Sequence, residues 1–129
     1  KIARTYNLPI MIHLGFNNLE KIKKTIINNY INFIFSHAAF PYYNDLLKFF
    51  KNSKNVLIDL SSHHVNEKII NFSIDSIGSK RCLFGIDDPY GGEEMAQKIK
   101  RWIFDSPISL IEKENIMSKN FLELYERKR

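Results

Sequence analysis

The sequence holds a single cysteine, Cys82, in 129 residues, which excludes a disulfide framework and any zinc site built from several thiolates. Glycine (5) and proline (4) are scarce, which argues against collagen-like and linker-like chains. No apolar run reaches the ~20 residues that a membrane span needs, and no basic start followed by an apolar stretch marks a secretory leader. We therefore expect a cytoplasmic protein without a membrane partner.

The charge balance is basic but diffuse. The formal net charge is +5, from 19 basic and 14 acidic residues. The densest basic clusters lie at 21–24, 98–101 and 127–129, and the first two fall on segments patterned as amphipathic helices. Solvated helix faces explain such charges, so we expect no nucleic-acid partner.

Short apolar segments recur about every 25 residues, a spacing typical of βα units. They are rich in β-branched and aromatic residues, which indicates strands buried on both faces, at 8–13, 32–37, 55–61 and 81–87. Apolar residues at helical spacing predict helices within 19–30, 46–50, 65–77, 95–103 and 121–125. Ser106 and Pro107 have the form of an N-cap and first-turn proline, so we predict a further helix from there through Ile111. The pattern predicts an α/β fold with parallel neighbouring strands, either an open sheet or half of an eight-unit barrel.

Polar side chains stand where these segments end. The first ends in His13, the second in His37, the third carries Asp59, and the fourth ends in Asp87 and Asp88. The carboxyl ends of parallel strands carry the chemistry in barrels of this type. A single histidine there is often structural, but two imidazoles and a carboxylate are the donors that borderline divalent metals prefer. The pattern therefore favours a metal site.

Two further motifs carry weaker signals. His63 and His64 follow the third strand by one loop, where an exposed position is the ordinary interpretation and a substrate contact the alternative. Gly91 and Gly92 lack the remaining residues of a phosphate-binding loop, so we interpret them as a turn before a helix.

Several segments together resemble the amidohydrolase superfamily. They are LPIMIHLG (8–15), the run from FIFSHAAF to NVLIDLSS (33–62), IGSKRCLFGIDDPYGG (77–92) and IMSKNFLELY (116–125). The branch they resemble is the amidohydrolase-related group that includes aminocarboxymuconate-semialdehyde decarboxylase. The resemblance implies a distorted (β/α)8 TIM barrel, with residues 1–129 as its C-terminal half (strands five to eight) and the N-terminal half absent.

The resemblance also implies roles for the residues at the strand ends. His13 would be a metal ligand, His37 either a ligand or the catalytic imidazole that polarises the substrate, and Asp87 a ligand and proton-shuttling base. Zinc is the usual metal implied, and the substrate would be a small carbonyl-containing molecule. Asp59 matches a position that is structural in the family.

Three departures from the family pattern bear on these roles. Ile86 stands where Ser or Thr is usual, and Asp88 stands where an aromatic residue is usual, so the choice of Asp87 over Asp88 rests on the flanking Gly85 and Pro89. No His-x-His pair, which supplies two ligands in the family, occurs in the sequence. We therefore expect the chain to need the missing half of the barrel or a homo-oligomer.

Two interpretations compete with a metal-dependent hydrolase or decarboxylase. One is a catalytically inactive truncated remnant or a small α/β binding module, which the residues around Asp87 support. The other is a related metal-dependent deoxyribonuclease barrel, whose fourth strand here would carry Glu-Thr-Asp, which Gly85-Ile86-Asp87 does not match.

Overall fold

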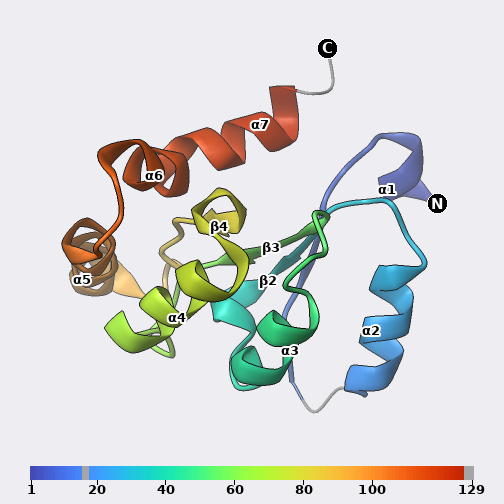
Figure 1. The fold of residues 1–129 in the computed structure, drawn as a ribbon, viewed down its shortest axis with the longest axis horizontal. Helices are drawn as coiled ribbons and strands as arrows, with labels where there is room; N and C mark the ends of the chain where they lie inside the picture. Colours follow the sequence, from blue (N-terminus) through green and yellow to red (C-terminus); the bar gives the residue numbers. More distant parts are fainter. Residues whose placement is uncertain (16–17, 127–129) are drawn as a thin grey trace.

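A computed structural model of the chain describes residues 1–15 and 18–126, for residue 126 the backbone only. Four strands form one parallel sheet in the order of the sequence, as the βα pattern predicted (Figure 1). Their bounds are β1 Ile10–Ile12, β2 Phe33–Phe35, β3 Val56–Asp59 and β4 Cys82–Leu83. The expected α/β fold is thereby confirmed.

Helical segments connect and follow the strands. The α-helices are α1 Ile2–Thr5, α2 Leu19–Ile27, α3 Tyr43–Phe49, α4 Glu67–Ile77, α5 Gly92–Asp105, α6 Leu110–Glu114 and α7 Asn120–Glu126. Short 3-10 turns cover Ser36–Ala39 and Ser79–Arg81, and a π-helical turn, Asn115–Lys119, joins α6 to α7.

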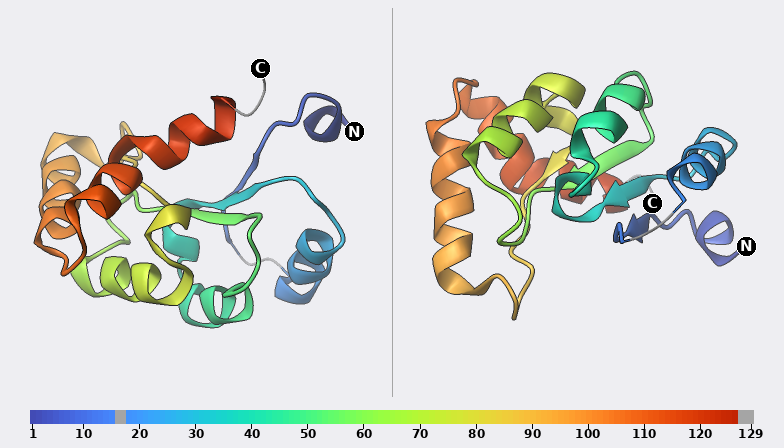
Figure 2. Two further views of the ribbon diagram at one scale, coloured as in Figure 1. Left: turned by 45° about the horizontal axis from the view of Figure 1, so that its top comes forward. Right: turned by 90° about the horizontal axis from the view of Figure 1, so that it is seen from below.

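Alternate residues of the strands face two different layers, because successive side chains of a strand point to opposite faces. Phe33, Phe35, Val56 and Ile58 belong to the main core, which also holds the buried residues of α2 to α5. Ile34, Leu57 and Leu83 face the other way and form a second cluster with Leu124 of α7. Figures 1 and 2 show this arrangement, with α3 and α4 on one side of the sheet and α7 on the other.

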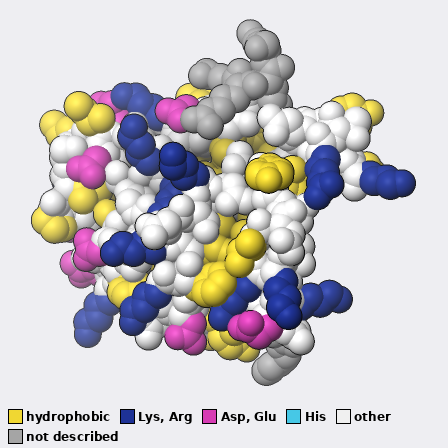
Figure 3. Space-filling view, turned by 45° about the vertical axis from the view of Figure 1, so that its right-hand side comes forward, with side chains coloured by type: hydrophobic (Ala, Val, Ile, Leu, Met, Phe, Trp, Pro, Cys, Tyr) yellow, Lys and Arg dark blue, Asp and Glu magenta, His cyan; other side chains and the backbone are white. Residues whose placement is uncertain are grey.

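The second layer leaves apolar surface exposed. Met11 of β1 is 59% exposed, and Phe121 and Leu122 of α7 are about half exposed. Figure 3 shows hydrophobic side chains gathered in the middle of one face, with Lys and Arg side chains around them. Exposed apolar area of this kind marks contact surfaces, and it is the surface that half of a barrel would leave open.

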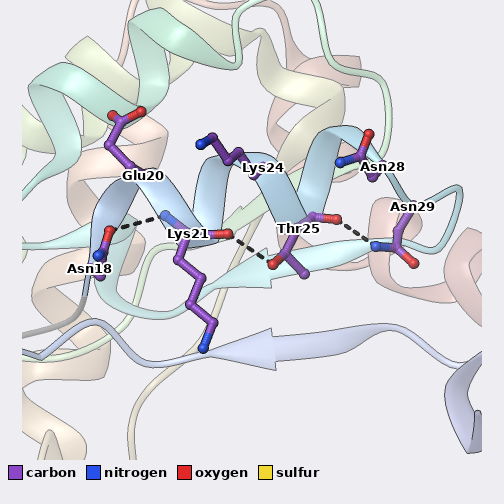
Figure 4. Close-up of a pocket in the computed structure, with 7 residues that line it drawn as sticks. All are labelled: Asn18, Glu20, Lys21, Lys24, Thr25, Asn28 and Asn29. Carbon is purple, nitrogen blue, oxygen red and sulfur yellow. Dashed lines mark hydrogen bonds between the residues drawn. The ribbon is translucent and has the colours of Figure 1, made fainter.

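Side-chain caps set where the helices begin. Asn18 accepts a hydrogen bond from the backbone N–H of Lys21 at the start of α2 (Figure 4), and Asn66 caps α4 in the same way. Ser109 and Glu112 form a capping box at the start of α6. The prediction that Ser106 and Pro107 open this helix is wrong: Ser106 instead ends α5.

Strand β4 is shorter than the 81–87 segment predicted, because its outer edge is occupied by the C-terminal helical region. The Phe84 N–H donates to the Ile116 carbonyl (2.9 Å), and the Asn120 side chain donates to the Cys82 carbonyl (2.8 Å). On its inner edge, the Leu83 carbonyl accepts from the Leu60 N–H of the segment after β3. Both edges of β4 are thus satisfied within the described residues.

A single arginine ties β4 to the loop after α3. The Arg81 guanidinium donates to the carbonyls of Phe50, Lys51 and Ser53, and its Nε donates to the Ile77 carbonyl. Burial lowers the pKa of Arg81 from its usual value. These hydrogen bonds anchor the start of β4, and therefore also the loop that follows it.

None of the helices in the described residues is long and apolar enough to cross a membrane.

The single thiol provides a test of the fold. Cys82 is fully buried, and burial raises its pKa to about 12. Because the thiolate is the reactive form, we expect Cys82 of the folded chain to react with Ellman's reagent at neutral pH at least about 100-fold more slowly than in urea, since reaction then requires opening of the fold. Equal rates in buffer and in urea would show that the isolated chain does not hold this structure.

Candidate active site at the carboxyl ends of the strands

The three residues predicted as metal ligands lie at one edge of the sheet. His13 directly follows β1, His37 lies in the 3-10 turn after β2, and Asp87 lies in the loop after β4. All three line one hollow of about 380 Å³. Parallel strands explain the convergence, because their carboxyl ends meet at the same edge of a sheet.

The hollow is walled by apolar and polar residues from all four strands and from α7. Besides the three residues above, it is lined by Met11, Ile34, Ser36, Asp59, Ser61, Leu83, Phe84, Gly85, Ile86 and Phe121. A mainly apolar pocket with a few convergent polar groups is the usual form of a small-molecule site.

The imidazoles and the carboxylate lie close to one another. The His13 and His37 ring centroids are 5.0 Å apart, with the rings nearly perpendicular. His37 Nε2 lies 3.9 Å from Asp87 Oδ2. The His37 side chain is 11% exposed and that of Asp87 25% exposed, while His13 is exposed. Nε2 of His37 therefore faces the carboxylate inside the hollow without being in hydrogen-bond range of it.

A left-handed backbone turns His37 into the hollow. His37 has the same position in the strand alternation as Phe33 and Phe35, which face the helices. Its φ of 54° and the φ of 53° and 64° at Ala38 and Ala39 break that alternation directly after β2. Asp87 is also left-handed, with φ 58°. Such conformations cost roughly 1–3 kcal/mol each in residues other than glycine and cluster at functional sites.

A row of buried polar side chains, Asp59 and Ser61, lies behind His37, and Asp59 is the position that the family resemblance gave as structural. The Ser61 hydroxyl donates to the Asp59 carboxylate, and Ser61 Oγ lies 3.1 Å from His37 Nδ1. Burial raises the pKa of Asp59, and hydrogen bonds from the Ser61 hydroxyl and the His37 backbone N–H act in the opposite direction. Asp59 is thus linked to the His37 ring through Ser61 and also lines the hollow.

The two loop histidines lie close to the same edge. His64 stacks on Phe40, with ring centroids 4.7 Å apart, and its ring lies 6.3 Å from that of His37. His63 contacts His64 at 4.1 Å. Partial removal from water lowers the pKa of His64, and the neighbouring His63 and His37 add to the effect. Both side chains are exposed, as the sequence analysis expected.

The donor set fits a divalent ion by its chemistry. Two nitrogen or oxygen donors about 2.1 Å from one tetrahedral ion lie about 3.4 Å apart, and His37 Nε2 and Asp87 Oδ2 are 3.9 Å apart. Within residues 1–15 and 18–126, however, no group of three or more His, Cys, Asp or Glu side chains is placed to hold a metal ion together.

A second hollow is larger but lacks comparable chemistry. It measures about 450 Å³ and lies along α2, lined by Asn18, Glu20, Lys21, Lys24, Thr25, Asn28 and Asn29 (Figure 4). Its side chains bond mainly to the helix itself, as in the contact of Thr25 with the Lys21 carbonyl. We therefore place the candidate site at the strand ends.

Comparison with solved structures shows which fold this is. An amidohydrolase from Burkholderia multivorans with bound zinc matches 97% of this chain with a TM-score of 0.83 and 15% identity. A TIM-barrel protein from Bordetella bronchiseptica matches with a TM-score of 0.78 and 18% identity. A dihydroxybenzoic acid decarboxylase from Polaromonas, with bound manganese and an inhibitor, matches with a TM-score of 0.65 and 13% identity. No family model and no curated protein matches the chain.

The chain spans about half the length of these neighbours. It covers 55%, 48% and 52% of the three chains named above, while 97–98% of its own length is matched. The chain therefore has the fold of about half of a TIM barrel, as these proteins have it. This confirms, at the level of the fold, the resemblance that the sequence segments indicated.

Asp59, Ser61, Gly85 and Phe121 are among the lining residues that were not assigned to the site from the sequence. Asp59 and Ser61 are two residues apart at the end of a strand, a spacing that places both on one face, and this signal was present in the sequence. Phe121 gave no such signal, because its place depends on how α7 packs across the sheet.

Gly85 offers a test of how tightly the site is packed. A Cβ on Gly85 would lie 2.1 Å from Asp59 Oδ1 and 3.1 Å from Ser61 Cβ. We expect Gly85→Ala to cost about 2–3 kcal/mol of unfolding free energy and to shift the NMR resonances of the His37 ring.

The matched control is Gly78→Ala. Gly78 has φ +85° and open space around it, so the substitution should cost about 1–3 kcal/mol through backbone strain alone. It should leave the His37 resonances unchanged. Equal effects of both variants on the His37 ring would contradict the close packing of Gly85 on Asp59.

Proposed function

We propose that this chain is the C-terminal half of a metal-dependent hydrolase or decarboxylase acting on a small carbonyl-containing substrate. The observation that carries the proposal is the convergence of His13, His37 and Asp87 in one hollow at the carboxyl ends of parallel strands. It is supported by neighbours of the same fold that are amidohydrolases and decarboxylases and that carry zinc or manganese.

In this proposal His13, His37 and Asp87 hold a divalent ion, with zinc as the first candidate. Such an ion acts as a Lewis acid and lowers the pKa of a bound water. The strand ends and their left-handed turns supply the fixed positions that a ligand set needs. Because the chain covers half of a barrel, the proposal includes further ligands from the other half, which would complete the partial set.

Two residues of the chain, His37 and Asp87, would then have separate roles in the reaction. His37 presents Nε2 to the hollow and would polarise the substrate carbonyl. Asp87 Oδ2, 3.9 Å from that nitrogen, would accept and return a proton. Leu83, Phe84 and Phe121 form an apolar wall that would exclude water from the substrate.

One observation favours a second candidate, an inactive remnant or small α/β binding module. In the described part of the chain, no three ligand-type side chains are placed to hold a metal. If the other half of the barrel does not exist, this geometry would leave the site without a metal.

Metal binding by the purified chain tests whether the three residues of this chain form a metal site. We expect isothermal titration with ZnCl₂ or MnCl₂ to show one ion bound per chain, and His13→Gln and Asp87→Asn each to weaken binding by at least about tenfold. The result expected of an inactive remnant is no saturable binding by the wild-type chain.

Matched controls come from residues of the same type that lie outside the hollow. His63→Gln and Asp88→Asn alter an imidazole and a carboxylate that do not line the hollow, so both should bind as the wild-type chain does. A loss of binding in Asp88→Asn but not in Asp87→Asn would move the ligand by one residue.

A further inference from the structure

The polar row behind His37 is built from the ends of two neighbouring strands. β2 and β3 pair in parallel, with Phe35 opposite Ile58, so the turn that carries His37 lies beside the end of β3. Asp59 and Ser61 leave the end of β3 on one face. Their exposed fractions are 9% for His37, 8% for Asp59 and 3% for Ser61. At this depth each polar atom needs a partner within the protein.

The hydrogen-bond directions in this row follow from counting protons. A serine hydroxyl has one proton to donate, and Ser61 donates it to the Asp59 carboxylate. The contact of 3.1 Å between Ser61 Oγ and His37 Nδ1 can then be a hydrogen bond only if Nδ1 carries the proton. A neutral imidazole protonated at Nδ1 has its lone pair on Nε2.

The opposite side of the ring agrees with this assignment. Nε2 of His37 lies 3.9 Å from Asp87 Oδ2, which is beyond the range of a donated hydrogen bond. The Asp59 carboxylate reaches the His37 ring through Ser61, whose hydroxyl it holds.

We infer that Ser61 and Asp59 are positioning residues that hold the His37 imidazole in its Nδ1–H tautomer, with the Nε2 lone pair directed into the hollow. The use of that lone pair, on a metal ion or on a substrate proton, rests on the function proposed above. The tautomer itself is a property of this chain and does not depend on that function. Partners of this kind fix the orientation and basicity of histidine ligands in other metal sites.

The test is the protonation state of the His37 ring in the metal-free chain. In a long-range ¹H–¹⁵N NMR spectrum of the ¹⁵N-labelled chain at about pH 8, where free imidazole is neutral, the shifts of the two ring nitrogens show which carries the proton. His→Gln variants at 13, 63 and 64 assign the His37 signals. We expect the Nδ1–H form at His37, and a dominant Nε2–H form would overturn the inference.

Variants then show whether Ser61 and Asp59 cause the preference. Ser61→Ala and Asp59→Ala should each shift the His37 signals toward the Nε2–H form, whereas Ser61→Thr keeps the hydroxyl and should keep the wild-type spectrum. The control is Ser73→Ala, which removes a buried hydroxyl that has no hydrogen-bond partner among the described residues and should leave His37 unchanged. An unchanged tautomer in Ser61→Ala would contradict the inference.

Titration of the same variants with ZnCl₂ separates this inference from the proposed function. If both hold, Ser61→Ala binds zinc about 10–100-fold more weakly than the wild-type chain and Ser61→Thr binds normally. A wild-type chain with the Nδ1–H tautomer but no zinc binding contradicts only the proposed function. Zinc binding together with a His37 tautomer that is the same in Ser61→Ala and in the wild-type chain contradicts only the positioning role.

Discussion

Hydrogen bonds between the four parallel strands fix a common register, and the candidate site depends on that register. The pairing of Ile12 with Phe35, Phe35 with Ile58, and Ile58 with Cys82 sets the level at which each strand ends. Residues one step further along then lie side by side at the edge of the sheet. Because side chains alternate between faces, His13 and Asp59 lie on the face of the sheet that carries the second apolar cluster. A slip of one residue in any strand would turn its polar end toward the helices.

His37 shows what the register alone does not provide. In a regular continuation of β2 it would face the core, since Phe33 and Phe35 do. The left-handed turn over His37, Ala38 and Ala39 reverses its direction, and this turn is conformationally costly by roughly 1–3 kcal/mol per residue. The two alanines in it are fully buried, which holds the turn against the main core. Burial of these two alanines against the helical layer therefore stabilises a backbone conformation that directs His37 to the opposite face of the sheet.

Much of this arrangement could be predicted from the sequence, and the failures have physical reasons. Continuous apolar segments identified all four strands, and the residues at their ends predicted that His13, His37 and Asp87 lie together, because both signals are local. The start of α6 was wrong because Ser106 and Ser109 are both plausible caps, and only Glu112 three residues after Ser109 completes the capping box. The end of β4 was wrong because it depends on Ile116, which packs against that strand from more than thirty positions away.

The two edges of the sheet differ in a way that bears on how a barrel could be closed. The outer edge of β4 already bonds to the Ile116 carbonyl and the Asn120 side chain, so an added strand would have to displace these groups. β1 is the other end of the sheet, and Met11 on it is largely exposed. A second copy of this chain, related by a two-fold axis along the barrel, would need both edges at once. Among the described residues, an added strand would therefore displace fewer groups beside β1, the strand that His13 follows, than beside β4.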